Sequence, residues 1–262
     1  MSKSVAIKDL VEGLRLWELW VRLCTSEVRR RYKRTLLGPM WVAISLGAFA
    51  TALSIVWSAL WKQDVQVYLP FVLSGLIPWT MFASSLAESC MAFVSGESSM
   101  KARQFPYTIL IHVVVGRNAI IFGHNLITYL LAALICTVPL SWYMIMVIPG
   151  FLLLVINLSW ISLLTAILCL RYRDLQQLVT ILLQTAMFIT PLFWPPESLG
   201  GRAQILVDAN VLYHMIDVVR SPLLGKPVAL HSYLVTIGLA IVGWVGTLWL
   251  YERKRQRLVY WM

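Results

Sequence analysis

The chain has 262 residues, of which 59% are hydrophobic and only 13% are charged, whereas charged residues usually make up about a quarter of a soluble globular domain. So little polar surface cannot coat a water-soluble fold, and the composition therefore predicts lipid as the surrounding solvent. The net charge of +10 would suit nucleic acid, but the basic residues stand beside apolar runs and form no separate basic face, which argues against nucleic acid as a partner.

An amphipathic segment precedes the first apolar run. Apolar residues recur at three- and four-residue steps between residues 7 and 28, the period of a helix with one apolar face. We expect a cytoplasmic interface helix within residues 7–34, because its tryptophans suit the headgroup boundary. A helix docked on a partner protein would give the same pattern. No cleavable signal sequence is expected, since the first apolar run starts only at Leu36.

Six apolar runs follow, and a helix needs roughly 20 such residues to cross a bilayer. We expect spans at about residues 36–60, 69–94, 110–138, 142–170, 178–194 and 232–250. The predicted fold class is an all-α integral membrane protein, with one transmembrane domain over residues 1–262. The external segment at residues 195–230 is too polar to span and is divided by Pro and Gly, which predicts short re-entrant or interfacial helices there.

Lys and Arg are distributed unevenly between the two sides. If the N-terminus lies in the cytoplasm, 17 of the 22 fall on the cytoplasmic side and four outside, with Arg117 inside a predicted span. Positively charged connections are held on the cytoplasmic side of a membrane. The distribution therefore predicts a multi-pass chain with both termini in the cytoplasm.

Polar residues interrupt two of the predicted spans. Glu88 and Arg117 lie at similar depths in successive spans, and we hypothesise an ion pair between them. Alternatively, Arg117 reaches lipid phosphates alone while Glu88 faces water. His124 and Asn125 lie nearer the middle of the membrane, where hydrogen bonds between helices are the ordinary explanation and substrate contact is the alternative.

Catalytic and metal-binding patterns were sought along the chain. Neither GxxxxGK[ST], which cradles nucleotide phosphates, nor the zinc-binding HExxH occurs. The four cysteines are scattered without metal-ligand spacing. We therefore expect no catalytic residue, metal site or cofactor in this chain, and any ATP hydrolysis must come from another chain.

Several local signatures, in this order, resemble the membrane subunits of type-2 ABC exporters that move polysaccharides, above all O-antigen and capsule exporters. They are RYKRTLLGPMW at 31–41, KARQFPYTIL at 101–110, RNAIIFGHNLI at 117–127, RYRDLQQL at 171–178, TPLFWPPESL at 190–199 and NVLYHMIDVVRSPLLG at 210–225. One departure is Asn210-Val211, where the family often has Asn-Pro. The turn before the last predicted helix of the external segment is therefore in question.

This resemblance implies a homodimer in the bacterial inner membrane that surrounds a pathway for lipid-linked polysaccharide. It also implies two copies of a separate ABC ATPase, which bind ATP and Mg²⁺. The residues that the resemblance favours for contact with this ATPase are Arg31, Lys33, Lys101 and Arg103. The alternative for these four is positive-inside topology and contact with anionic membrane lipids.

The resemblance further implies that the first and fifth spans line the glycan pathway, where flat aromatic rings can stack on sugars. The candidates are Trp57, Trp61, Phe188, Phe193 and Trp194. Aromatic anchoring at the membrane boundary is the alternative explanation for several of them. An exporter of teichoic acid or of a small hydrophobic drug shares the topology, and a secondary transporter is disfavoured because no internal repeat is present.

Overall fold

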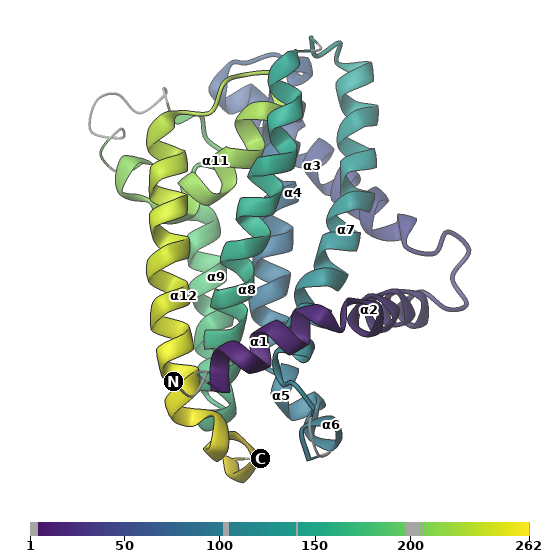
Figure 1. The fold of residues 1–262 in the computed structure, drawn as a ribbon. Coiled ribbons are helices and arrows are strands. Elements are labelled where there is room, and N and C mark those ends of the chain that lie inside the picture. Colours follow the sequence, from purple (N-terminus) through teal and green to yellow (C-terminus); the bar gives the residue numbers. More distant parts are fainter. Residues whose placement is uncertain (1–4, 102–104, 140, 197–204, 206, 262) are drawn as a thin grey trace.

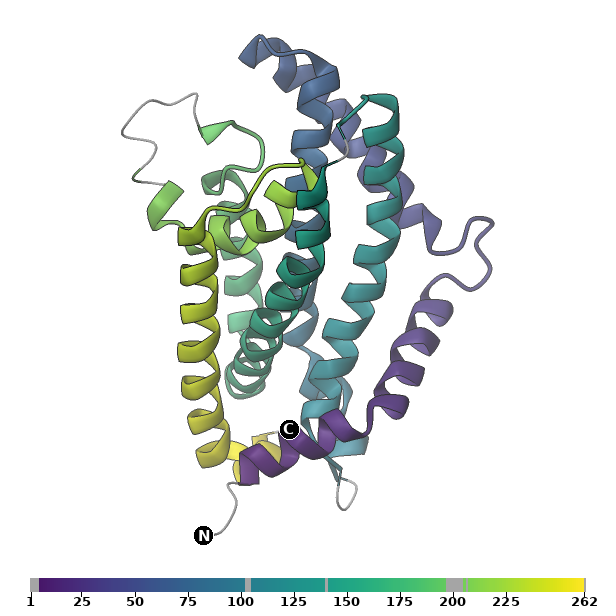
Figure 2. The same cartoon turned by 45° about the horizontal axis from the view of Figure 1, so that its top comes forward.

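A computed structural model describes residues 5–101, 105–139, 141–196, 205 and 207–261, with the side chain of Trp61 also outside the described part. The regular elements described are all helices. Long helices run side by side through the molecule, while shorter helices cross near both ends (Figures 1 and 2). The described residues nearest the two ends of the chain lie at the same end of this bundle.

Among the described residues, five helical segments are long and apolar enough to cross a membrane. They contain α3 (Met40–Trp61), α4 (Val65–Ser89), α7 (Thr108–Ile135), α8 (Val147–Arg171, extended by the 3-10 turn Trp142–Met146) and α12 (Leu230–Leu258). These confirm five of the predicted spans. The fifth predicted span, 178–194, corresponds to α9 (Leu175–Ile189), which has only 15 residues. It ends early because Thr190 precedes Pro191 and adopts an extended ψ of 135°, as residues before proline usually do.

Two predicted boundaries move for local reasons. The first span begins at Met40 because turns occupy residues 32–39, where Arg34 and Gly38 have positive φ angles of 72° and 55°. The second predicted span, 69–94, is broken after Ser89. Two short helices follow it, α5 (Ala92–Ser95) and α6 (Glu97–Lys101).

The N-terminal interface helix is two helices, α1 (Val5–Arg15) and α2 (Trp17–Arg31). The prediction of one continuous helix is wrong, because Leu16 turns the chain with a ψ of 37°. Both pieces pack against α7. Close approach depends on glycine: a Cβ at Gly13 would lie 2.4 Å from Thr108 Oγ1, and one at Gly116 would lie 2.8 Å from Cys24 Sγ.

Helix α11 (Val211–Leu223) lies inside the bundle, where it packs on α4, α8 and α12. Asn210 caps it by accepting from the backbone N–H groups of Leu212 (3.0 Å) and Tyr213 (3.1 Å), so the Asn-Val departure still forms a regular helix start. Met215, Val218 and Val219 are almost fully buried. This part of the segment predicted to be external therefore belongs to the core.

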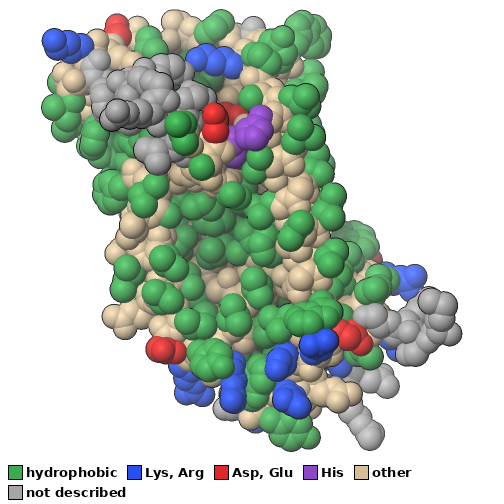
Figure 3. Space-filling view, turned by 90° about the vertical axis from the view of Figure 1, so that its left-hand side faces the viewer, with side chains coloured by type: hydrophobic (Ala, Val, Ile, Leu, Met, Phe, Trp, Pro, Cys, Tyr) green, Lys and Arg blue, Asp and Glu red, His purple; other side chains and the backbone are tan. Residues whose placement is uncertain are grey.

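Charged and apolar side chains occupy different levels of the bundle. One face of the molecule shows a hydrophobic and neutral belt, and Lys and Arg gather at the end where the chain termini lie (Figure 3). Such a belt with a basic end is typical of a chain that spans a membrane.

Candidate functional site

Four charged side chains join α2, α4 and α7. Arg117 donates through Nη2 to Glu88 Oε2 at 2.7 Å, and through Nη1 it contacts Glu27. Arg31 donates to the other oxygen of Glu88 at 3.1 Å, and Asn118 Nδ2 donates to Glu88 Oε2 at 2.7 Å. The predicted pair of Glu88 and Arg117 is therefore present, and Arg117 does not act alone.

The sequence did not predict the ion pair of Glu27, because Glu27 lies on the polar side of an amphipathic helix, where a carboxylate usually faces water. The side chains of Glu27, Glu88 and Arg117 are only 28%, 22% and 17% exposed. With Arg31 included, two carboxylates face two guanidinium groups, so the cluster is neutral. Partly buried ions of this kind need such complete pairing.

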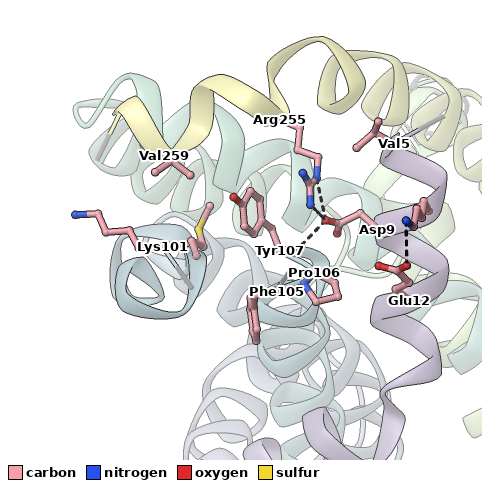
Figure 4. Close-up of a pocket in the computed structure, with 11 residues that line it drawn as sticks. Val5, Asp9, Glu12, Lys101, Phe105, Pro106, Tyr107, Arg255 and Val259 are labelled. Carbon is pink, nitrogen blue, oxygen red and sulfur yellow. Dashed lines mark hydrogen bonds and ion pairs between the residues drawn. The ribbon is translucent and has the colours of Figure 1, made fainter. Parts of the chain in front are cut away.

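A buried carboxylate forms a second junction at the lower end of the bundle. Asp9 of α1 is 2% exposed and accepts from the backbone N–H of Thr108 at 3.1 Å and from Arg255 Nη2 at 2.7 Å. The Thr108 hydroxyl and the N–H of Tyr107 also donate to it. Figure 4 shows Arg255 and Tyr107 converging on Asp9 from two other segments. Asp9 thus links α1, the start of α7 and the end of α12.

Helix ends explain why carboxylates stand at these places. The first N–H groups of a helix lack partners within the helix and carry partial positive charge. Asp9 supplies acceptors to the start of α7, and Glu252 of α12 does the same for α1 by accepting from Val5 and Ala6 at 3.1 and 2.6 Å. A groove of about 880 Å³ opens beside this junction and reaches Lys101 of α6.

Of the four basic residues predicted for ATPase contact, the three that the structure describes do not lie on one surface. Arg31 is paired with Glu88, and Lys33 is exposed in the turn after α2, at the side of the bundle (Figures 1 and 2). Lys101 pairs with Glu97 at 2.5 Å at the end of α6, at the bottom of the bundle. Arg103 lies outside the described residues.

The aromatic candidates do come together. Trp57 of α3 stacks on Phe193 with ring centroids 6.3 Å apart, and Phe188 of α9 lies 6.1 Å from the same ring. Trp194 donates through Nε1 to the Phe188 carbonyl at 3.2 Å. Phe193 is 4% exposed and Phe188 is 66% exposed, so only part of the cluster is open. Trp61 ends α3, and its side chain lies outside the described part.

A residue that the sequence assigned to an external loop holds this cluster in place. Arg220 of α11 is 4% exposed. It donates to the carbonyls of Pro191 and Leu192, at 2.5 and 3.4 Å, and its guanidinium lies 3.8 Å from the centre of the Phe71 ring. These contacts fix the segment that carries Phe193.

The two remaining polar candidates lie apart from the ion pairs. His124 bonds through Nδ1 to the Ile120 carbonyl of its own helix at 2.8 Å. Asn125 is buried and lines a cavity between α3, α4 and α7. Within the described ranges, no three His, Cys, Asp or Glu side chains stand close enough to hold a metal ion.

Comparison with known proteins gives one family match. The model of the ABC-2 type transporter family matches residues 18–224. These limits take in every long helix except α12.

Two relatives illustrate how far the similarity extends. The O-antigen export system permease protein RfbA of Klebsiella pneumoniae is 25% identical over 238 residues, which is 87% of this chain and 90% of that protein. A protein of the same name from Myxococcus xanthus is 25% identical over 184 residues, or 69% of this chain and 70% of its own length.

Proposed function

This chain belongs to the ABC-2 type transporter family, and from that membership we propose that it is the transmembrane subunit of an ATP-driven exporter of lipid-linked polysaccharide, of the O-antigen or capsule type. The observation that carries this proposal is the end-to-end similarity to a permease named for O-antigen export. A multi-pass membrane chain of this family is a transport component. ATP hydrolysis, with Mg²⁺, is assigned to a separate ABC ATPase.

The proposed topology has six crossings, with both termini on the cytoplasmic side of the inner membrane. The excess of Lys and Arg at the end of the bundle where the termini lie supports this orientation. Helix α9 spans only about 22 Å by itself, short of a hydrocarbon core of about 30 Å. We assign the rest of the fifth crossing to the buried segment after it, which includes Leu192 and Phe193.

Helix α11 is proposed to be re-entrant. If the fifth crossing ends outside and α12 begins there, a buried helix between them has to enter and leave the membrane from the outer side. Its buried backbone is acceptable there because it packs on α4, α8 and α12 instead of lipid. All these elements share one hydrophobic core, which supports a single domain.

Motion from the ATPase is proposed to enter through α6 and the Asp9 junction. Helix α6 lies at the end of the bundle where the chain termini lie (Figure 1), which is the proposed cytoplasmic side, and Lys101 lines the groove that also contains Asp9 and Arg255. Because Asp9 joins α1 to the start of α7 and the end of α12, a push on the α6–α7 link would move three segments together. Lys33 and Arg103 remain candidates for contact with the ATPase.

The aromatic cluster of Trp57, Phe188 and Phe193 is proposed as one wall of the polysaccharide pathway, completed by a second copy of this chain. Phe188 supplies the exposed ring. Flat rings give weak, repeated contacts with sugars, which hold a polymer without trapping it.

Purification and reconstitution test this function. The tagged chain, extracted in mild detergent, should bring down two copies of itself and two of an ABC ATPase. Proteoliposomes that contain this complex should move lipid-linked polysaccharide in an ATP-dependent way. A complex that moved only teichoic acid, small hydrophobic drugs or protons, or a chain that bound no ATPase, would contradict the proposal.

A further inference from the structure

A cavity of about 520 Å³ lies between α3, α4 and α7. On α7 its lining runs from Asn118 to Asn125, so it extends from the Glu88–Arg117 pair toward the outer half of the bundle. Arg31 and Tyr32, at the end of α2, line the cavity at the end near Glu88. The volume is within the range of about 300–1,000 Å³ that small-molecule sites usually have.

The lining contains several polar side chains among its apolar ones, although the helices that supply it are apolar. Ser45 of α3, Thr80 and Ser84 of α4, and Asn118 and Asn125 of α7 all line this one space. Polar side chains inside membrane segments are costly, and they commonly mark a substrate path or pair with one another.

Asn125 points most directly to a ligand. It is 1% exposed, and its Oδ1 accepts no hydrogen bond from any of the described residues. A buried acceptor without a donor costs about 1–3 kcal/mol, so such an atom needs an explanation. A donor that enters the cavity would supply one.

Three other polar side chains of the cavity already use their hydrogen-bond donors within the protein. Ser45 donates its hydroxyl hydrogen to the Trp41 carbonyl at 2.7 Å, and Thr80 donates to the Ile77 carbonyl at 2.9 Å. Asn118 uses its amide N–H groups on Glu88 and the Val114 carbonyl. The oxygen atoms of these three side chains keep lone pairs, so a ligand that bonds to them or to Asn125 Oδ1 must donate hydrogen bonds. Sugar hydroxyls do so, whereas phosphate and ester oxygens only accept.

The edge of the cavity offers hydrogen-bond donors, in contrast to the acceptors inside. Arg31 uses Nη1 for Glu88, and its side chain is 54% exposed, so its remaining donors are open to an anion such as a phosphate. Trp41, which also lines the cavity, is 46% exposed. Its ring offers apolar surface for a hydrocarbon chain.

We propose that this cavity binds the lipid-proximal end of a glycolipid: one phosphate at Arg31 and the first sugar ring inside, with hydroxyls donating to Asn125, Thr80 and Ser45. The proposal rests on the proposed function, because it locates where such a substrate is first held. An ordinary anionic phospholipid shares the phosphate but lacks the ring of hydroxyls.

Equilibrium binding to the full-length chain in phosphatidylcholine nanodiscs tests this site. The probes are octyl phosphate that carries one hexose, octyl phosphate alone, and phosphatidylglycerol. The hexose probe should bind best. Asn125→Leu and Thr80→Val should each weaken the hexose probe about tenfold and leave octyl phosphate unchanged. The matched control is Thr51→Val, which removes an exposed hydroxyl bonded to the Gly47 carbonyl of α3 and should change neither.

Two binding results would overturn the site: unchanged hexose binding in both cavity variants, or displacement of the hexose probe by an equal concentration of phosphatidylglycerol. Thr80→Val keeps the side-chain volume, so it decides the matter if Asn125→Leu does not fold. Binding is measured without ATPase. A wild-type chain that binds the probe but never exports polysaccharide therefore contradicts only the proposed function, whereas export unaffected by either variant contradicts only the site.

Discussion

Arg117 on α7 donates to Glu88 on α4 across 2.7 Å and reaches Glu27 on α2 with its other terminal nitrogen. One cation thus fixes α2, which lies outside the five membrane-length segments, to two helices that lie among them. Glu88 keeps Arg31 as a second partner, but Glu27 has no other ion pair among the described residues. The cluster therefore depends on Arg117 more than on any other member.

Replacement of Arg117 should destabilise the protein more than replacement of either carboxylate. Arg117→Gln leaves Glu27 partly buried without a cation, and we expect a loss of about 2 kcal/mol in the free energy of unfolding, below the value for a fully buried pair. Glu88→Gln combined with Arg117→Gln should cost less than the sum of the two single changes. Chemical unfolding in detergent measures both effects.

The matched control for this experiment is Arg22→Gln. Arg22 pairs with Glu18 on α2, but the two side chains are 83% and 67% exposed, so the loss should stay below about 0.5 kcal/mol. Equal losses for the Arg22 and Arg117 variants would show that the cluster does not hold α2.

Asp9→Asn should loosen the junction of α1, α7 and α12. An amide turns one acceptor into a donor, which then faces the N–H groups of Thr108 or the guanidinium of Arg255. We expect α1 to exchange its amide hydrogens faster and ATP-driven transport to fall at least tenfold. Hydrogen exchange and the proteoliposome assay measure the two effects. The control is Glu12→Gln, one turn along α1. The Glu12 side chain is 48% exposed, and its carboxylate makes a long contact of 3.8 Å with Lys8, so this variant should behave as wild type.

Sequence patterns predicted five of the membrane-length helices correctly, because the length of an apolar run is a local property. They also found the Glu88–Arg117 pair, since both charges interrupt apolar runs at similar depth. Asp9 was missed because its partners are backbone N–H groups about 100 residues away, and nothing in an amphipathic pattern separates a capping carboxylate from a solvated one. The break at Leu16 was missed for a similar reason: no Gly or Pro marks it.

Arg220 shows what charge counting cannot predict about a basic residue. Counting charges assigns it to the external side, which is compatible with its position in α11, but counting cannot reveal that the guanidinium is buried against the Pro191 and Leu192 carbonyls. Those acceptors exist only because α9 ends before Pro191 and leaves carbonyl groups without helical partners.

Arg220→Lys should therefore destabilise the protein although the charge is kept. Lysine lacks the planar fork that serves several carbonyls at once, and at least one buried carbonyl would lose its donor at a cost of about 1–3 kcal/mol. A lower unfolding midpoint in detergent is the expected measurement. Lys226→Met, in the exposed turn after α11, should leave the midpoint unchanged, and an unchanged midpoint for Arg220→Lys would contradict the assigned role.

Substitutions at two rings of the aromatic cluster should affect stability and transport separately. Phe193→Ala removes a ring that is 4% exposed and should cost about 3–5 kcal/mol in unfolding free energy. Phe188→Ala removes a ring that is 66% exposed, so it should leave stability nearly unchanged while it slows polysaccharide export. Ile189→Ala, at 62% exposure beside it, is the control for lost apolar surface. Equal export by the Phe188 and Ile189 variants would argue against ring contact with the sugar.

Cys24 reports on whether α2 stays docked on α7. Its thiol donates to the Val113 carbonyl at 3.4 Å, and burial, with a smaller contribution from Glu27, raises its pKa to about 11. At pH 8 only about one thiol in a thousand is ionised, and the thiolate is the reactive form. In a variant with serine at the other three cysteines, maleimide labelling should be slow at pH 8 and rise about tenfold per pH unit up to pH 10.

The sign of the linked effect follows from the raised pKa. The folded state favours the neutral thiol, so this contribution to stability is complete below the ordinary pKa of about 9 and is lost as the pH rises toward 11.

Arg117→Gln should release α2 and expose Cys24. Since burial is the larger cause of the raised pKa, labelling at pH 8 should become at least tenfold faster, although Arg117 itself lowers that pKa. The same maleimide assay on a variant that keeps only Cys136, which is half-buried beyond the end of α7, is the control and should not respond to Arg117→Gln. If Cys24 in the otherwise native chain reacted as fast as free cysteine at pH 8, α2 would not be held on α7.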